Sequence, residues 1–179
     1  MLYMFFANGF EEVEAIATLD VIRRAGIEIK SVGVDAKEIT GSHGITVVCD
    51  ETTSSVSFNN LEGVILPGGM PGTTNLLENK TVNEYIDYAS AKDLYICAIC
   101  AAPMILGRKG LLNGKEAICF PGFEDELSGA VISDKFVCKS DKFITAKGMG
   151  SAVKFGLEIV AAFKGKEFAD GLADTLQIS

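Results

Sequence analysis

The chain has 179 residues, about the length of a single domain, and residues 1–179 are predicted to form one domain. Its 16 lysines and arginines and 24 aspartates and glutamates give a formal net charge of −8, which argues against binding to nucleic acid. Apolar residues make up 48% of the chain, enough for a core that needs no disulfide or structural metal.

Membrane insertion and secretion are not expected. No apolar run approaches the roughly 18 residues of a transmembrane helix, and no basic region precedes the short apolar N-terminal segment. The five cysteines are odd in number and spread along the chain, which indicates reduced thiols in a cytoplasmic protein.

Short apolar runs alternate with longer amphipathic stretches, a pattern typical of βαβ units around a parallel sheet. Residues 2–7 are apolar on both faces, as in a central strand. A helix over residues 11–24 follows, with acids at its start and arginines at its end. Its apolar stripe is formed by Val13, Ile16, Leu19 and Ile22.

The later segments continue this α/β pattern. Further strands are expected at residues 28–34, 46–49, 64–66, 94–99, 117–120, 136–139 and 144–146. Further helices are expected at residues 81–91, from Pro103 onward, and at residues 151–163, where Ser151 is the N-cap and Gly165 ends the helix. The predicted fold is a compact α/β sandwich.

Cys100 lies where a predicted strand passes into a helix, with only the small residues Ala101 and Ala102 after it. This is the layout of a nucleophile elbow, in which a sharp turn lifts the side chain above the strand ends. The start of the helix favours thiolate over thiol. The alternative is that Cys100 is a small buried hydrophobic residue.

Cys97 and Cys100 form a C-x-x-C pair, which raises the alternative of a redox dithiol or a zinc site. On a strand, residues i and i+3 face opposite sides about 10 Å apart, whereas a disulfide needs Cα atoms within about 7 Å. A second C-x-x-C pair is absent from the sequence and it contains one histidine, so zinc is not expected.

A nucleophilic thiol needs donors for the oxyanion that develops during attack. The glycines in Pro67-Gly68-Gly69 end a predicted strand and present unobstructed N–H groups, and the Ala101 N–H can complete the set. The alternative is a tight turn that needs a positive φ. The segment lacks the Lys-Ser/Thr ending of a phosphate-binding loop.

A partner for proton transfer is also required. Glu11, Glu12 and Glu14 open the first helix at the sheet edge that also holds Cys100. Two of them are explained by compensation of the helix dipole, while Glu14 borders the apolar stripe and can turn inward. His43, the single imidazole, lies in a predicted exposed turn and is a weaker candidate.

Six motifs along the chain resemble those of the ThiJ/PfpI superfamily in order and spacing, and the resemblance covers essentially the whole chain. It is closest to the branch of YajL and the Parkinson-disease-linked deglycase. The motifs are NGFEEVE (8–14), DVIRRAG (20–26), LPGG (66–69), AICAAP (98–103), FPGFE (120–124) and GMGS (148–151).

The resemblance implies a flavodoxin-like three-layer sandwich, a homodimer and no cofactor. It matches Cys100 to a reactive, easily oxidised cysteine and Glu14 to the glutamate that hydrogen-bonds it. The residues matched to the backbone pocket around the sulfur are Gly68, Gly69 and Ala101, and those matched to the lining of the same depression are Arg24, His43, Phe120, Gly150 and Ser151.

Two departures from the family limit what the resemblance implies. Ala101 follows the cysteine where protease-like relatives have a histidine, and Phe120 stands where some close relatives have one. His43 falls where many relatives carry an arginine. A Cys-His-acid triad, and with it peptidase activity, is therefore not expected.

The resemblance, taken together with these residues, suggests two functions. The first is a glyoxalase or deglycase that acts on small dicarbonyls or glycated proteins, with Cys100 as nucleophile and Glu14 as proton shuttle. The second is a redox sensor or redox-regulated chaperone that acts through oxidation of Cys100. Thiazole biosynthesis, an older family label, has no support in the sequence. The remaining cysteines, Cys49, Cys119 and Cys138, are predicted to be structural.

Overall fold

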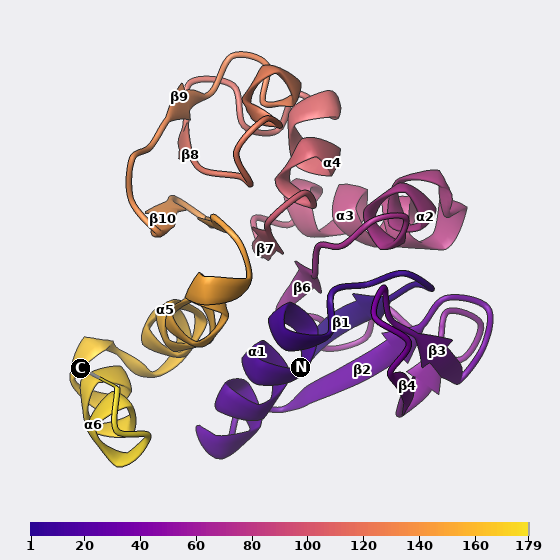
Figure 1. The fold of residues 1–179 in the computed structure, drawn as a ribbon, viewed down its shortest axis with the longest axis horizontal. Coiled ribbons are helices and arrows are strands. Elements are labelled where there is room, and N and C mark those ends of the chain that lie inside the picture. Colours follow the sequence, from indigo (N-terminus) through magenta and orange to yellow (C-terminus); the bar gives the residue numbers. More distant parts are fainter. Residues whose placement is uncertain (179) are drawn as a thin grey trace.

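The computed structural model describes residues 1–178 and is organised around one central sheet (Figure 1). Its strands are β1 (Leu2–Phe6), β2 (Ile29–Gly33), β5 (Glu51–Thr52), β6 (Gly63–Leu66), β7 (Tyr95–Ile99), β10 (Val137–Ser140) and β11 (Phe143–Ala146). They lie in the order β10-β11-β7-β6-β1-β2-β5. Neighbouring strands are parallel except β10 and β11, which are antiparallel.

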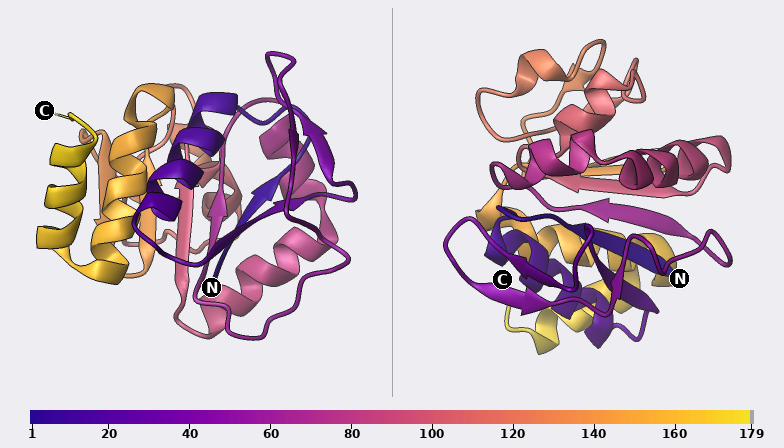
Figure 2. Two further views of the ribbon diagram at one scale, coloured as in Figure 1. Left: turned by 90° about the horizontal axis from the view of Figure 1, so that it is seen from below. Right: turned by 90° about the vertical axis from the view of Figure 1, so that its right-hand side faces the viewer.

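Helices cover both faces of this sheet, as the two further views show (Figure 2). They are α1 (Glu12–Arg24), α2 (Gly72–Glu78), α3 (Lys80–Ala91), α4 (Pro103–Arg108), α5 (Ala152–Lys164) and α6 (Lys166–Thr175). Along β1, Tyr3 and Phe5 join the core cluster that includes α3 and α4, while Met4 and Phe6 join the cluster that includes α1 and α5. The predicted three-layer α/β sandwich with a mostly parallel sheet is confirmed.

The strand order places a topological switch point at β1. The chain runs from β1 through α1 to β2 on one side, and later returns to β6 on the other side of β1. The loops that follow β1 and β6 therefore diverge at the carboxyl edge of the sheet, where ligands bind in open α/β folds. Strand β7 pairs with β6, so its carboxyl end reaches the same edge.

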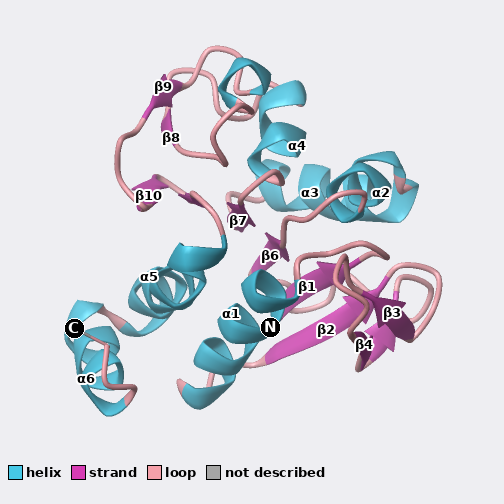
Figure 3. Ribbon diagram, viewed as in Figure 1, coloured by secondary structure: helices cyan, strands magenta, loops and turns pink. Residues whose placement is uncertain are grey.

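The remaining elements agree with the sequence prediction in part. Residues 46–49 do form a hairpin strand, β4 (Thr46–Val48), paired with β3 (Glu38–Thr40). Residues 117–120 do not form a strand of their own; β8 (Glu116–Ala117) is shorter and pairs with β9 (Val131–Ile132) outside the central sheet. Loops dominate the chain between α4 and β10 (Figure 3). The helices α2 and α6 were not predicted.

The predicted apolar stripe of α1 is confirmed at Ile22 but wrong at Val13 and Ile16. Val13 and Ile16 are exposed, whereas Ala15, Thr18 and Ile22 face the sheet and α5. The helix is rotated because its N-terminal turn buries Glu12 and Glu14, which find hydrogen-bond partners inside the protein. No helix within residues 1–178 is long and apolar enough to cross a membrane.

The close approach of α1 and α5 depends on Gly156, and this can be tested by mutation. A Cβ atom at position 156 would lie 2.9 Å from Cβ of Val21, so Gly156→Leu should lower the free energy of unfolding. The expected loss is about 1–3 kcal/mol, the usual cost of overpacking.

Gly171 in α6 is the matched control, since nothing lies within 4 Å of a Cβ atom there. Gly171→Leu should add about 0.5–1 kcal/mol through helix propensity. Urea unfolding of both variants measures the difference, and equal stabilities would contradict this packing.

Candidate active site

Cys100 lies directly after β7 at the sharp turn that the sequence predicted. Its φ of 64° is in the left-handed region, which is uncommon for any residue other than glycine. The Cys100 N–H donates to the Ala146 carbonyl at 2.9 Å, and the Cys100 carbonyl accepts from the Phe120 N–H at 2.8 Å. These two hydrogen bonds hold the strained turn in place.

The thiol of Cys100 is the accessible one in this chain. Cys100 is half-buried, while Cys49, Cys97, Cys119 and Cys138 are buried and all five are free. Cys97 faces the core from within β7, so the C-x-x-C pair is not a dithiol site. The Gly69 and Ala101 N–H groups act on the Cys100 sulfur in the direction that lowers its pKa.

Glu14 reaches the same point from the first turn of α1. It is 1% exposed, its Oε2 accepts the Gly68 N–H at 3.0 Å, and its carboxyl shares a hydrogen bond with the Cys100 thiol. The Glu11 carboxylate, one turn earlier, caps α1 by accepting the Glu14 N–H at 2.7 Å. The predicted pairing of Glu14 with Cys100 is therefore present in the structure.

Gly68 gives the two side chains room to meet. A Cβ atom at this position would lie 2.5 Å from Oε2 of Glu14 and 2.6 Å from Cβ of Cys100. Because its N–H is bonded to Glu14, Gly68 is not free to bind an oxyanion. The predicted oxyanion donors are thus reduced to the N–H groups of Gly69 and Ala101.

The Glu14 pKa is raised to about 7. Burial is the largest cause, and the nearby charge of Glu11 adds to it. The hydrogen bonds with Cys100 and the Gly68 N–H oppose this shift without cancelling it. Glu14 therefore exchanges a proton near neutral pH, as a general acid–base group must.

The Cys100 pKa is raised to about 12, which is opposite to the lowering expected from the start of a helix. Burial is the main cause, followed by the charge of Glu14 and the hydrogen bond to it, while the Ala101 and Gly69 N–H groups act in the other direction. Helix α4 has only six residues and starts three positions later, so its dipole contributes little.

The two shifts together mean that the pair holds two protons below about pH 7 and one proton, which resides mainly on Cys100, from about pH 7 to about pH 12. The charge of Glu14 opposes the thiolate, so the thiolate forms when this proton sits on Glu14. In that state the sulfur accepts hydrogen bonds from Glu14 and from the Gly69 and Ala101 N–H groups. The reactive state is therefore reached by moving one proton between neighbouring side chains.

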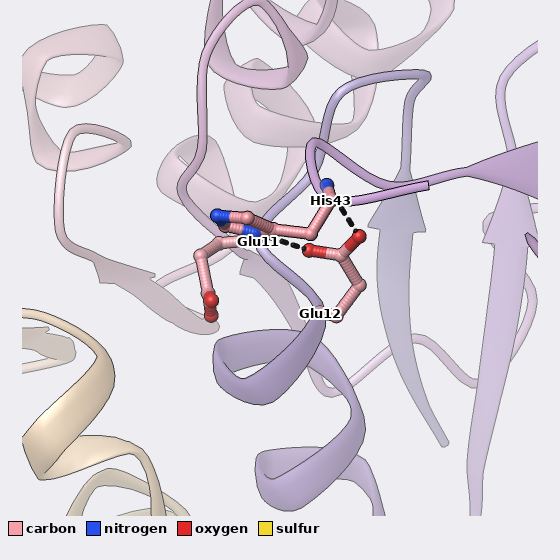
Figure 4. A group of neighbouring side chains, drawn as sticks. All are labelled: Glu11, Glu12 and His43. Carbon is pink, nitrogen blue, oxygen red and sulfur yellow. Dashed lines mark hydrogen bonds and ion pairs between the residues drawn. The ribbon is translucent and has the colours of Figure 1, made fainter. Parts of the chain in front are cut away.

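His43 belongs to a different group of side chains (Figure 4). The ring Nδ1 of His43 lies 2.8 Å from Oε2 of Glu12, and the backbone N–H of His43 donates to Oε1 of the same carboxylate at 2.7 Å. Burial opposes the charge on Glu12, but the hydrogen bonds from His43, from its own N–H and from Ile45 outweigh it and lower the Glu12 pKa to about 2. The His43 pKa is raised by this contact.

Potential metal ligands of Glu11, Glu12 and His43 lie within 4.8 Å of one another. Each carboxylate already has a role in the fold, because Glu11 caps α1 and Glu12 fixes the turn around His43. We therefore assign the cluster a structural role, in which His43 is bonded to Glu12.

Arg24 is not brought to the Cys100 site. It ends α1, about 15 Å along the helix axis from Glu14, and pairs with Asp20 on its own helix at 2.6 Å. The prediction that Arg24 lines the depression is not supported within this chain.

Phe120 and the 148–151 turn do border the site. The Phe120 ring lies 3.2 Å from the position of a Cβ atom on Gly148, and Oε1 of Glu14 lies 3.9 Å from the same position. Ser151 is buried, and its hydroxyl donates to the Gly148 carbonyl at 2.7 Å rather than capping α5. Gly150 is exposed in the same turn.

Two neighbours of Phe120 were missed by the sequence analysis. Phe136 and Met149 lie with it around one depression, and both are exposed. The signal was available in part, because Met149 lies inside the GMGS motif, but the approach of Phe136 depends on how the loop before β10 folds.

Comparison with known proteins shows which sequences this chain is similar to. Residues 1–162 match the DJ-1/PfpI family. Protein dj-1beta of Drosophila melanogaster is 32% identical over 176 residues, which are 97% of this chain and 94% of the fly protein. A Caenorhabditis elegans protein named glutathione-independent glyoxalase DJR-1.2 is 31% identical over 168 residues, 93% of this chain and 89% of the worm protein.

The fold is also found among solved structures. The oxidized form of Toxoplasma gondii DJ-1 matches with a TM-score of 0.95 and 30% identity, covering 99% of this chain and 98% of the other. The flavodoxin-like architecture expected from the sequence is thereby confirmed.

The shared proton predicts an unusual effect of Glu14→Gln. Glutamine removes the charge that opposes the thiolate, so alkylation of Cys100 by iodoacetamide at pH 7–8 should accelerate, on the order of tenfold for each unit by which the pKa falls. Peptide mass spectrometry measures the rate.

Glu12→Gln is the matched control, since Glu12 is another buried carboxylate of α1 but bonds to His43. Its alkylation rate should remain that of the wild type. Slower alkylation of the Glu14→Gln variant would contradict the proposed coupling.

Proposed function

Because the chain belongs to the DJ-1/PfpI family, we propose that it is a cysteine-dependent, cofactor-free enzyme of the glyoxalase or deglycase type. Its substrates are small dicarbonyls or their adducts on proteins. The observation that carries the proposal is the contact between the Cys100 thiol and Glu14, a buried acid whose pKa is about 7. The glyoxalase name of the worm relative agrees with it.

The reaction begins with proton transfer from Cys100 to Glu14, and the thiolate then attacks the aldehyde carbon of a 2-oxoaldehyde. A C–S bond forms and the carbonyl π electrons move to oxygen. As the C–S bond forms the sulfur loses its charge, so the Gly69 and Ala101 N–H groups become available to this oxyanion. The oxyanion then takes up a proton to give a hemithioacetal. The carboxyl of Glu14 is the nearest source of that proton.

The second stage moves hydrogen between adjacent carbons. The Glu14 carboxylate removes the proton from the carbon bonded to sulfur and returns it to the neighbouring carbon through an enediol. The first carbon is oxidised and the second is reduced, so no external oxidant or reductant is needed. Water then hydrolyses the thioester, releasing a 2-hydroxy acid and the thiol.

Peptidase chemistry is not proposed. It relies on a histidine that orients and deprotonates the nucleophile, and His43 is bonded to Glu12 instead. Within the described residues, Glu14 is the acid–base side chain in contact with Cys100.

The proposed enzyme acts as a cytoplasmic homodimer. Support for a dimer comes from exposed apolar side chains on α1 and the β3–β4 hairpin, which are Val13, Ile16, Ile45 and Val48. Five free cysteines suit the reducing cytoplasm.

A second candidate function is redox sensing or a redox-regulated chaperone activity through oxidation of Cys100. The observation that favours it is the selective exposure of this one thiol, the other four being buried. A protonated Glu14 can donate to a sulfinate oxygen as it does to the thiolate. The related Toxoplasma gondii structure is described as oxidized.

Turnover of methylglyoxal tests the proposed enzyme. Cys100→Ser should abolish consumption, and Glu14→Gln should lower kcat by about 100-fold or more because it cannot carry a proton. Below the Glu14 pKa of about 7 both groups are protonated, so wild-type kcat/KM should fall as the pH drops through 7. Equal rates for the three proteins would reject the mechanism.

Mild peroxide treatment separates the two candidates. A sensor should gain about 32 Da at Cys100 alone, the mass of two oxygens, and show negligible turnover. An enzyme should turn over methylglyoxal while reduced and lose that activity as Cys100 is oxidised. Intact-mass measurement beside the turnover assay distinguishes these outcomes.

A further inference from the structure

An apolar depression of about 350 Å³ opens beside the Cys100–Glu14 pair. Phe120, Phe136 and the 148–151 turn, which includes Met149, line it. The three side chains are 46%, 63% and 54% exposed, respectively, which is unusual for large apolar groups gathered in one place. The mechanism above uses none of them.

Gly148 connects this depression to the acid. A Cβ atom at position 148 would lie 3.2 Å from the Phe120 ring and 3.9 Å from Oε1 of Glu14. The φ of Gly148 is 164°, extended backbone that any residue can adopt. The absent side chain therefore matters for space, since a Cβ atom there would contact both the Phe120 ring and Glu14.

The depression is built on fixed backbone. The Ser151 hydroxyl accepts the Gly148 N–H at 3.2 Å and donates to the Gly148 carbonyl at 2.7 Å. The Phe120 N–H bonds to the Cys100 carbonyl, and the Lys147 N–H bonds to the Phe136 carbonyl at 2.9 Å. The walls are thus tied both to the nucleophile and to each other.

The charge and size of the depression limit its occupant. Its one charged side chain, Lys147, has its ammonium 5.7 Å from the centroid of the Phe136 ring, a distance of cation–π contact at the rim. The apolar walls offer few partners for hydroxyl groups, so sugar-like chains would lose hydrogen bonds with water there. A volume of 350 Å³ is at the small end for ligand sites and suits one ring or a short alkyl chain.

We propose that this depression binds the non-reacting substituent of the substrate, and that the preferred substrates are 2-oxoaldehydes with an aromatic or hydrocarbon substituent, such as phenylglyoxal. This substrate class rests on the proposed function. With Cys100 bonded to the aldehyde carbon, the substituent on the neighbouring carbon projects past Glu14 toward Phe120. The chemistry is unchanged, and phenylglyoxal plus water gives mandelate.

The test compares phenylglyoxal with methylglyoxal in three proteins: wild type, Phe136→Ser and the control Phe168→Ser. Phe168 on α6 is 45% exposed and has the Lys164 ammonium 5.3 Å from its ring, so it matches Phe136 in surroundings but lies outside the depression. The measured quantity is the ratio of kcat/KM for phenylglyoxal to that for methylglyoxal.

In the wild type, kcat/KM for phenylglyoxal should exceed that for methylglyoxal by about tenfold, because additional carbons in an apolar pocket usually raise kcat/KM by at least this factor. Phe136→Ser should lower the ratio at least fivefold, and Phe168→Ser should keep the wild-type ratio. If Phe136→Ser does not fold, Met149→Ser takes its place with the same expectation. If both substrates are turned over but Phe136→Ser, or Met149→Ser in its place, leaves the ratio of the two kcat/KM values unchanged, the inference is overturned. The proposed function would then remain intact.

A second readout does not depend on turnover. Cys100 is alkylated with N-phenyliodoacetamide and with iodoacetamide, and the ratio of the two rates should fall in Phe136→Ser but not in Phe168→Ser. Should wild type consume neither dicarbonyl, the proposed function fails, and this ratio still decides whether the depression binds an aromatic group. An unchanged ratio would overturn it.

Discussion

The hydrogen bond between the Glu14 carboxyl and the Cys100 thiol is the interaction on which the site depends. Both groups have a raised pKa because burial disfavours their charged forms, so together they hold one proton above about pH 7 and take up a second below it. Neither group alone supplies the chemistry. The acid gives the thiol a place to leave its proton, and the two N–H groups of Gly69 and Ala101 stabilise the sulfur once it has done so.

The fold brings this pair together from three distant parts of the chain. Glu14 comes from the start of α1, Gly68 from the end of β6 and Cys100 from the end of β7. These segments meet because the strand order switches at β1, which places their carboxyl ends at one edge of the sheet. The absence of a side chain at position 68 then allows the acid and the thiol to touch.

The sequence was sufficient for the architecture and for the chemical pair. Strand–helix alternation predicted the layers, and the position of Cys100 between a strand and two small residues predicted the turn. The position of Glu14 at the border of the predicted stripe indicated that it could turn inward, and it is buried. The same pattern gave no sign that Val13 and Ile16 are exposed, because the helix turns to bury carboxyls that have specific partners.

What remained out of reach depends on long-range packing. Sequence spacing does not tell that Gly68 donates to Glu14 or that Glu12 engages His43. The upward direction of the Cys100 pKa has the same origin, since burial and a neighbouring charge outweigh the short helix that follows. That residues 1–179 form a single domain stays a prediction.

The most direct measurement of the shared proton is an infrared titration of the Glu14 carboxyl, taken as the difference between wild type and Glu14→Gln. The account predicts that the protonated-carboxyl band disappears with a midpoint near pH 7. A midpoint at the ordinary glutamate value of 4.5 would show that Glu14 is too weak a base to take up a proton near neutral pH, and would contradict the account.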